Sequence, residues 1–471
     1  MTSKYIFRTT TLVLGIVLFI SCLGDSPHGD FVPSPDAQIY RFSMESRADT
    51  SNFLSATAFT IDQVQGRIFN QVRLPYRFSV DSVVLNIAGS PVTVEGLHQV
   101  EIHLVNPDSS FTLNRGDSIA INRLNGGRIV TTAPDRNNTK EYVFELRIFQ
   151  QDPFIITWDN TSSNYISPSL ILQAQQTISL NNRFITYYLA GGAIGAMENV
   201  ASDGVAWTPV SLTGFPATAQ LSSILSVDTA AFILDDVNNL FRTTNGINWI
   251  PKPTLYPIVT IYGVLPATTG GDILLIVNDD DTYKFAKTDG FSTDNEGYLI
   301  ITPFNAIPLN VLNQIPITGF SAVQVDNPAV YGAKFIILSG GTNRNGFPNS
   351  DIWLFEFQQN PQLPTGGTIR VLNQIKGLVA QEGSTLFFYN NRLYMMVMTP
   401  LGENRLMYSE NYGLSWAVAG EGVTFPVDFT HRTHASIIAD DDFIWVFGGQ
   451  TPLGQFSDVW RGRLNLLDET L

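Results

Sequence analysis

Arginines and carboxylates in the C-terminal half are the residues of this sequence best suited to chemistry. Hydrolysis of an acidic sugar would need several guanidinium groups around one carboxylate, together with a nucleophile and an acid. Most of the arginines fall in expected hairpin turns or outer strands, and Asp272, Glu382 and Glu403 are the acids without a structural assignment. The sequence therefore predicts no catalytic residue. The arginines are Arg183, Arg242, Arg344, Arg370, Arg392, Arg405, Arg432, Arg461 and Arg463.

Metal and cofactor sites are also disfavoured by the spacing of the candidate ligands. His431 and His434 stand three residues apart in "HRTH" with no third ligand nearby, so we expect them to make loop or strand hydrogen bonds. The acidic runs 279–281 and 440–442 lack the spaced oxygen ligands and glycine of a calcium loop and are typical of solvated turns. No phosphate-binding glycine loop, Gly-x-Ser-x-Gly or cysteine nucleophile occurs. We predict no metal and no cofactor.

The single cysteine, Cys22, lies at the end of an export signal. Lys4 and Arg8 precede an apolar run over 12–20, which is too short for a typical membrane-spanning helix. "FISC" resembles the lipobox of bacterial lipoproteins, although Phe19 replaces the usual leucine. The resemblance implies lipidation of Cys22 and a lipid anchor in the cell envelope, at the outer membrane or cell surface. An ordinary signal peptide with a coincidental cysteine is the alternative.

Residues 1–22 are accordingly expected to be a lipoprotein signal peptide. The Pro-, Gly- and Asp-rich segment 23–38 is expected to be a flexible tether to the first folded domain. Whether the protein faces the periplasm or the exterior stays open.

Bulk composition limits the class of protein. A chain of 471 residues favours two or more domains, and 15% charged residues with 37 glycines and 25 prolines indicate a turn-rich β protein. The formal net charge is −15, which disfavours a nucleic-acid partner because the chain repels phosphate.

Residues 39–180 show short alternating strands separated by turn clusters. In "KEYVFELRIFQ", Tyr142, Phe144, Leu146 and Ile148 share one face. This pattern predicts an Ig-like β-sandwich, with two smaller sandwiches as the alternative.

Residues 181–471 contain a repeated turn signature. An Asp or Asn can close an Asx turn, the following glycine supplies a positive φ, and the tryptophan fills the space between blades. The pattern resembles the Asp-box of sialidase-like propellers, in which these residues are structural, and the fourth copy lacks the tryptophan. The four copies are Asp203, Gly204 and Trp207; Asn245, Gly246 and Trp249; Asn411, Gly413 and Trp416; and Asp289 and Gly290.

A second signature resembles kelch repeats. An apolar strand ends in Gly-Gly, and an Asp-apolar-Trp sequence follows a variable loop. "ITYYLAGG" opens in the same way at Gly191 and Gly192. The two complete copies are Gly340, Gly341, Asp351 and Trp353; and Gly448, Gly449, Asp458 and Trp460.

Together the signatures predict an all-β chain in which the Ig-like β-sandwich is followed by a kelch/Asp-box-like β-propeller of about six blades. Five or seven blades stay open. The first segment is short and is expected to lack an inner strand, so strand exchange between the chain ends is expected to close the ring. The expected blades are 181–212, 213–256, 257–310, 315–365, 370–423 and 428–465.

Two segments, "GRIFNQVRLPYRFSVDSVVLNI" and "EYVFELRIFQQDPFIITW", resemble exported lipoproteins of the Bacteroidota, in which a sandwich precedes a propeller. The resemblance implies architecture and cellular address only. We expect a non-catalytic protein that binds a glycan or protein through propeller loops such as 341–349 and 449–457. A sialidase-like surface enzyme and a scaffold component of an outer-membrane complex are the alternatives.

Overall fold

The computed structural model describes residues 32–91, 96–227, 229–265, 272–359, 367–375, 383–399 and 401–467. The chain divides into two compact units, Met1–Asp152 and Pro153–Leu471. The expected signal peptide, Cys22 and the first part of the tether lie outside the described residues. Within these ranges, the helices are all too short or too polar to span a bilayer.

The N-terminal unit is a β-sandwich of two sheets that share one hydrophobic core. Met44 and Val83 of the smaller sheet and Ile102, Ile129 and Phe144 of the larger one belong to this core. The smaller sheet has the order β1 (Arg41–Glu45), β4 (Ser82–Ala88) and β7 (Ser118–Ala120). The larger has the order β2 (Phe59–Asp62), β3 (Arg67–Asn70), β9 (Thr139–Glu145), β8 (Arg128–Thr132), β5 (Gln99–Leu104) and β6 (Ser109–Thr112). The β3–β9 pair is parallel, and the short helices are α2 (Phe53–Ala56) and α3 (Ile121–Leu124).

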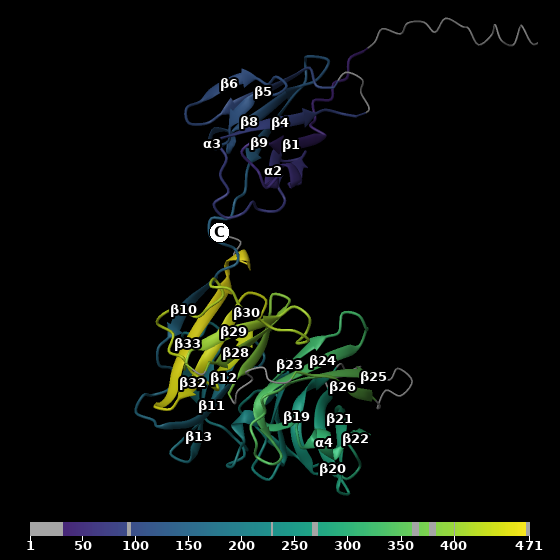
Figure 1. The fold of residues 1–471 in the computed structure, drawn as a ribbon, viewed down its shortest axis with the longest axis vertical. Helices are drawn as coiled ribbons and strands as arrows, with labels where there is room; N and C mark the ends of the chain where they lie inside the picture. The colour runs from purple at the N-terminus through teal and green to yellow at the C-terminus, as the bar shows by residue number, and fades with distance from the viewer. Residues whose placement is uncertain are drawn as a thin grey trace, which may run out of the picture. The chain divides into compact units, whose positions relative to one another are not determined.

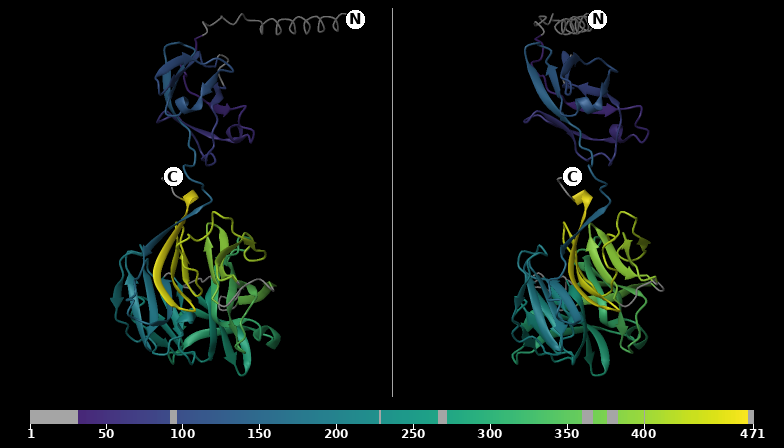
Figure 2. Two further views of the ribbon diagram at one scale, coloured as in Figure 1. Left: turned by 60° about the vertical axis from the view of Figure 1, so that its left-hand side comes forward. Right: turned by 90° about the vertical axis from the view of Figure 1, so that its left-hand side faces the viewer.

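In the described residues, the C-terminal unit is a propeller of six four-stranded antiparallel sheets (Figures 1 and 2). From inner to outer strand, blade 1 consists of β11 (Leu172–Ser179), β12 (Phe184–Ala190), β13 (Ala193–Asn199) and β14 (Thr208–Val210). Blade 2 consists of β15 (Leu225–Val227), β16 (Ala230–Leu234), β17 (Leu240–Thr243) and β18 (Ile250–Lys252). Blade 3 consists of β19 (Ile258–Leu265), β20 (Asp272–Asp279), β21 (Thr282–Thr293) and β22 (Leu299–Ala306). Blade 4 consists of β23 (Pro316–Asp326), β24 (Ala333–Asn343), β25 (Ile352–Gln359) and β26 (Gly367–Ile375). Blade 5 consists of β27 (Thr385–Tyr389), β28 (Arg392–Met398), β29 (Asn404–Ser409) and β30 (Ala417–Val418). Blade 6 consists of β31 (Ser436–Ala439), β32 (Ile444–Thr451), β33 (Gly454–Leu464) and β10 (Ile156–Ser162).

The six blades form a closed ring. Each inner strand contacts the inner strand of the next blade, and β31 of blade 6 contacts β11 of blade 1. Among the described residues, six hydrophobic clusters lie at the six junctions between neighbouring blades, so the propeller core is divided into wedges. At the junction of blades 1 and 2, for example, Tyr187 packs with Ile233 and Trp249.

Strand β10 closes the ring as the outermost strand of blade 6. In Figure 1 it lies beside β33, although the two come from opposite ends of the propeller sequence. Trp158 pairs with Gly462, and an ion pair of 3.0 Å joins Asp159 to Arg461. Strand exchange between the chain ends therefore does close the ring, but at the outer edge of the last blade.

Two expected boundaries differ from the structure. Blade 1 does have an inner strand, β11, which lies before residue 181, so the propeller takes in 153–180 as well. Its sequence "LQAQQTIS" is polar because the strand borders the central channel. The strand therefore lacks the apolar run by which the other propeller strands are recognised. Residues 367–375 form the outer strand of blade 4, whereas 370–423 was expected to be one blade.

Side-chain hydroxyl groups connect the inner strands of adjacent blades. The Leu386 backbone N–H donates to Ser321 Oγ at 2.8 Å, and the Thr177 N–H donates to Ser436 Oγ at 2.9 Å. Thr385 Oγ1 donates to the Ala435 carbonyl at 2.9 Å. Because the sheet ladder stops at each blade boundary, these bonds satisfy backbone groups that face the neighbouring blade.

Candidate ligand site at the mouth of the channel

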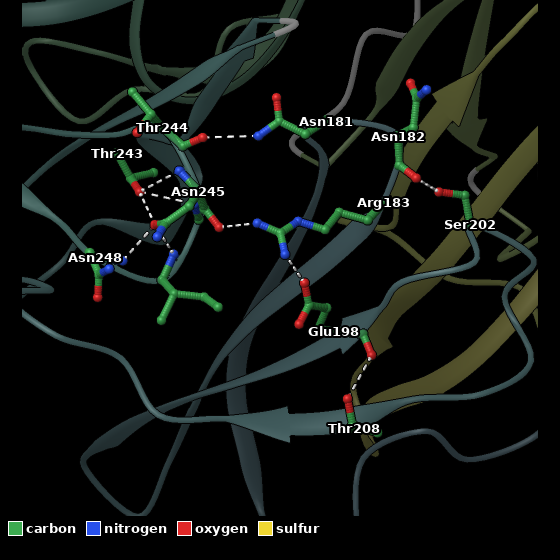
Figure 3. A network of polar contacts seen from close by, with 12 residues as sticks. Asn181, Asn182, Arg183, Glu198, Ser202, Thr208, Thr243, Thr244, Asn245 and Asn248 are labelled. Carbon is green, nitrogen blue, oxygen red and sulfur yellow. Dashed lines mark hydrogen bonds and ion pairs between the residues drawn. The ribbon is translucent and has the colours of Figure 1, made fainter.

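The Asp-box turns are structural junctions between blades. In blade 2, Asn245 Oδ1 accepts the backbone N–H groups of Ile247 at 3.0 Å and Asn248 at 2.8 Å (Figure 3). Gly246 has φ of 71°, and the indole N–H of Trp249 donates to its carbonyl at 3.3 Å. This indole bond is a feature that the sequence pattern did not predict.

The other two boxes repeat this geometry. Trp207 Nε1 donates to the Gly204 carbonyl at 3.0 Å, and Trp416 Nε1 donates to the Gly413 carbonyl at 3.1 Å. Asp203 Oδ1 accepts the Val205 N–H at 2.9 Å. The hydrogen bond from Asn199, followed by that from Val205, lowers the pKa of the Asp203 carboxyl because both bonds favour the charged form.

Each box glycine faces the preceding blade. A Cβ atom on Gly246 would lie 2.1 Å from Ile185 Cδ1, and one on Gly204 would lie 2.9 Å from the Trp445 ring. Arg183 of blade 1 pairs with Glu198 and donates to the Asn245 carbonyl, which ties the blade 2 box to blade 1 (Figure 3). Glycine is required here both for its conformation and for this close approach.

The three box tryptophans differ in burial. Trp249 is 3% exposed, whereas Trp207 and Trp416 are only partly buried, contrary to the expectation that all three are enclosed. Trp207 stacks on Tyr165 with ring centroids 4.3 Å apart, and Trp416 packs at the junction of blades 4 and 5. All three pack at junctions between blades, but Trp207 and Trp416 are partly accessible to solvent.

The fourth Asp-box is built into strand β21. Asp289 and Gly290 lie at a register shift between β21 and β22 instead of in a separate turn. Gly290 has φ of 52°, and its N–H donates to Asp272 Oδ1 at 2.7 Å. Phe291 stacks on Phe232 of blade 2 at 4.7 Å, which is the kind of contact to the preceding blade that the tryptophan makes in the other boxes.

The glycines of the two complete kelch-like copies lie within the second strands of their blades, near the C-terminal ends of β24 and β32. Gly340 and Gly341 have φ of 66° and 74°, and Gly448 and Gly449 have φ of 54° and 107°. Gly191 and Gly192 form the β12–β13 turn with φ of 57° and 79°.

The two kelch-like tryptophans, Trp353 and Trp460, are 2% and 3% exposed. The Trp353 indole N–H donates to Asn349 at 3.2 Å and not to Asp351, which is partly exposed, whereas Trp460 donates to Asp458 Oδ2 at 2.9 Å. The two equivalent aspartates therefore have different roles.

Two of the acids that the sequence left unassigned, Asp272 and Glu403, belong to different blades. Asp272 is 4% exposed and forms a 2.6 Å ion pair with Lys287. Glu403 lies exposed between β28 and β29, and Glu382 lies outside the described residues. Several arginines pair with acids near them in the ring, as in the Arg392–Glu410 pair. The side chain of Arg370 is not among those described.

The histidines and acidic runs make local contacts. His431 Nδ1 accepts the Asn404 N–H at 2.9 Å, and Asp440 Oδ1 accepts the backbone N–H groups of Asp442 and Phe443. Asp279 pairs with a lysine of the same hairpin. Over the described ranges, no three His, Cys, Asp or Glu side chains are grouped as metal ligands.

The polar side chains that do converge lie at one end of the central channel, where the inner strands begin. A cavity of ≈ 170 Å³ opens there, between residues of blades 1, 2, 4, 5 and 6, and adjoins a channel cavity of ≈ 460 Å³ lined by the inner strands. We call this cavity the channel mouth. Its polar side chains are Gln173, Gln175, Gln176, Ser222, Ser321, Ser384, Thr385, His434, Gln450 and Gln455.

Four of these side chains form a hydrogen-bonded chain along one side of the mouth. Gln450 Nε2 lies 2.9 Å from His434 Nδ1, and Gln455 Nε2 donates to Gln450 Oε1 at 2.7 Å. Gln175 Nε2 in turn lies 3.2 Å from Gln455 Oε1. The first three come from segments that the sequence singled out, "HRTH" and 449–457, whereas Gln175 lies on β11, which was assigned to the sandwich.

A buried ion pair lies next to the channel mouth. Arg432, 1% exposed, contacts both carboxylate oxygens of Asp458 and donates to the Gly448 carbonyl at 3.1 Å. Its guanidinium carbon lies 4.4 Å from the Phe429 ring centroid and 4.2 Å from that of Phe456. The pair is neutral overall and its charged groups are enclosed, so it fixes the entry to β31 without presenting a free charge to the mouth.

Tyr165, in the connection between β10 and β11, contacts the same network. Its hydroxyl lies 3.4 Å from Gln175 Oε1, and burial raises the pKa of the Tyr165 hydroxyl to about 12. The hydroxyl therefore stays neutral at physiological pH. The site offers neutral hydrogen-bonding groups, with His434 as the one ionisable side chain among the mouth residues named above.

Two family models match this sequence. The "DUF6242 beta propeller domain" matches residues 152–468, and the "Domain of unknown function (DUF6242) N-terminal domain" matches residues 37–146. Both ranges agree with the two structural units. Among curated protein sequences, none matches the chain.

Solved structures with similar folds include three propeller-type chains. One is described as "YCF48 bound to D1 peptide", at 10% identity and a TM-score of 0.30, covering 83% of this chain and 97% of that one. The Aleuria aurantia lectin in complex with Fucalpha1-6GlcNAc is 11% identical with a TM-score of 0.37, covering 62% and 93%. Trypanosoma rangeli sialidase with the inhibitor DANA is 9% identical with a TM-score of 0.40, covering 65% and 59%. Likenesses this low assign neither a ligand nor an activity to this chain.

Proposed function

The chain belongs to the DUF6242 family, and from that premise we propose that it is a lipid-anchored cell-envelope protein that binds a ligand at the channel mouth without transforming it. The sandwich and propeller are rigid β domains, and recognition groups in such proteins lie on loops and strand ends. The ligand in this proposal is a glycan or a protein segment.

One observation carries the binding proposal. Neutral polar side chains from five blades surround one cavity at the beginning of the inner strands. Binding sites are concave and combine apolar surface with a few polar groups that fix the orientation of the ligand. The Arg432–Asp458 pair and the hydroxyl bonds between inner strands hold these groups in place before any ligand arrives.

The binding proposal is tested with residues 23–471 produced without lipid. The protein is applied to a glycan array and to envelope proteins, beside a Gln455→Ala variant and a control variant, Gln150→Ala, in the N-terminal unit. Gln150 is exposed and remote in sequence from the mouth residues. We expect Gln455→Ala alone to lose the binding that the parent shows. Equal binding by all three proteins would contradict a ligand site at the mouth.

The anchoring proposal is supported by the sequence around Cys22: a basic start, a short apolar run and a single cysteine at the expected cleavage point. Replacing Cys22 by Ser should release the protein from the membrane fraction and remove the mass of the acyl chains. Unchanged membrane association and mass would refute the anchor and leave the binding proposal intact.

A further inference from the structure

We infer that the ligand of the channel mouth is a neutral sugar ring that stacks on Phe320. The inference rests on the proposed binding function and narrows it to one ligand class. It depends on three features of the mouth: the lack of Lys, Arg, Asp and Glu among its described residues, the supply of paired donors and acceptors, and the phenyl ring of Phe320.

Charge argues against an anionic ligand. The residues that line the mouth include no Lys, Arg, Asp or Glu among those described. The nearby Arg432 is occupied by Asp458, and the whole chain carries a formal net charge of −15. A sialic acid carboxylate or a phosphate would lose its hydration there without gaining a positive partner, which is costly.

The polar groups match the hydroxyls of a sugar. A glutamine amide has donors and an acceptor in one plane, and a serine hydroxyl both donates and accepts, so together they suit neighbouring sugar hydroxyls, which do the same. Gln176 and Ser222 come from adjacent blades and are accessible to solvent at the mouth. The adjacent Gln450–Gln455 bond keeps two further amides in fixed orientations.

Phe320 supplies an apolar face. It is the one Phe, Tyr or Trp side chain among the described residues that line the mouth, and it is partly exposed while also packing against the cluster between blades 3 and 4. Tyr262 holds it edge-on, with ring centroids 5.2 Å apart, and the Tyr262 hydroxyl is fixed by the Pro316 carbonyl at 2.7 Å. A Cβ atom on Gly341 would lie 2.8 Å from Phe320 Cβ. Any larger residue at position 341 would therefore displace Phe320.

The size of the mouth suits one ring. Its ≈ 170 Å³ is below the range of roughly 300–1,000 Å³ typical of sites for drug-sized ligands. A single terminal sugar residue, with its apolar C–H face on Phe320 and its hydroxyls toward the glutamines, uses both kinds of surface. An extended protein segment would need the adjoining channel cavity of ≈ 460 Å³ or the solvent for most of its length.

The test uses residues 23–471 on an array that carries neutral oligosaccharides and their sialylated or sulfated counterparts. The best neutral probe is then titrated by calorimetry against the parent, Phe320→Leu, Phe320→Tyr and the control Phe347→Leu. Phe347 is 66% exposed on the 344–351 hairpin and does not line the mouth. Melting temperatures of all variants are recorded, and Gln176→Ala replaces Phe320→Leu if the latter does not fold.

We expect binding of neutral probes that changes little between low and high salt, because no ion pair is formed. Phe320→Leu should weaken binding by about tenfold, the scale of one aromatic stacking contact, whereas Phe320→Tyr and Phe347→Leu should bind like the parent.

Three results would overturn the inference and leave the proposed function standing. The first is binding restricted to sialylated or sulfated probes, and the second is binding of a protein alone that Gln455→Ala abolishes. The third is binding of a neutral probe that Phe320→Leu does not alter. If the parent and Gln455→Ala do not differ in binding to any glycan or protein probe, the proposed function itself is contradicted.

Discussion

Equivalent residues of the repeats have unequal surroundings. Trp249 is enclosed between blades 1 and 2 with Tyr187 and Phe215 around it, whereas Trp207 and Trp416 are partly open to solvent. The same sequence pattern therefore gives different amounts of buried apolar surface, and stability should follow burial.

We predict that Trp249→Ala lowers the free energy of unfolding of the propeller by roughly 3–5 kcal/mol, the usual cost of truncating an enclosed aromatic residue. Trp207→Ala and Trp416→Ala should cost less, because water already reaches part of each ring. Denaturant titration of the three variants measures the difference. Equal losses at all three positions would show that partial exposure does not reduce the contribution of these rings.

Asp203 should make the first Asp-box sensitive to acid. Its pKa is lowered in the folded protein, so its stabilising effect is present above the ordinary aspartate pKa of about 3.9 and is lost as the pH falls through the folded value. We predict that Asp203→Asn melts below the parent at pH 7 and that the gap narrows by pH 3. Asparagine fits the turn, as Asn245 and Asn411 show. A gap that is constant with pH would contradict the assignment.

For individual residues, the sequence predicts backbone conformation well and contacts between blades poorly. The Asx turn and the positive φ of Gly204, Gly246 and Gly413 follow from residue types within a few positions. The bond from Arg183 to the Asn245 carbonyl joins residues 62 positions apart and depends on how two blades pack. The Gln175–Gln455 contact, which spans 280 positions, is beyond local patterns for the same reason.

Strand β10 should contribute to the stability of the closed ring. It covers the outer edge of β33, and Trp158 donates its indole N–H to the Thr424 carbonyl at 2.8 Å. Without it, blade 6 would present an open strand edge, which favours association with other chains.

We predict that residues 165–471 are less stable and more prone to aggregate than residues 153–471. A peptide covering 153–164 should restore part of the loss by refilling the edge. Unfolding midpoints and size-exclusion profiles, with a scrambled peptide as the control, measure both effects. Identical stability of the two fragments would mean that the closing strand is dispensable.

The strands whose place in the ring the sequence pattern does not predict have a common property. β11 carries Gln, Thr and Ser at the channel, and β26 follows a connection outside the described residues. Strands marked by Gly-Gly or Asx-Gly turns were found because the turns identify them. A polar inner strand has neither kind of turn, so only the strands with which it pairs show which blade it belongs to.

For the whole molecule, composition and repeat period were sufficient to predict an all-β chain with a sandwich followed by a propeller. The boundary between the units lies at residue 152 because β10 and β11 pair within the propeller. Local strand patterns cannot show which sheet a strand joins.

We predict that residues 23–471 do not hydrolyse fluorogenic sialosides or a panel of polysaccharides. The buried Asp272–Lys287 pair and the exposed position of Glu403 leave these acids without a common substrate site. Product release measured over hours, with an active sialidase as the positive control, tests this. Turnover that disappears in Asp272→Asn, Glu382→Gln or Glu403→Gln would replace the binding function with an enzymatic one.

The position of β10 also sets the order in which the propeller can be completed. The strand is made before every blade, yet its partner β33 ends near the C-terminus, and Asp159 and Arg461 are 302 positions apart. Blades 1 to 5 can form from neighbouring hairpins, whereas blade 6 must wait until almost the whole chain is available. Since pairings of such long range are slow to form, ring closure should be the last and slowest step of folding, during which β10 stays unpaired.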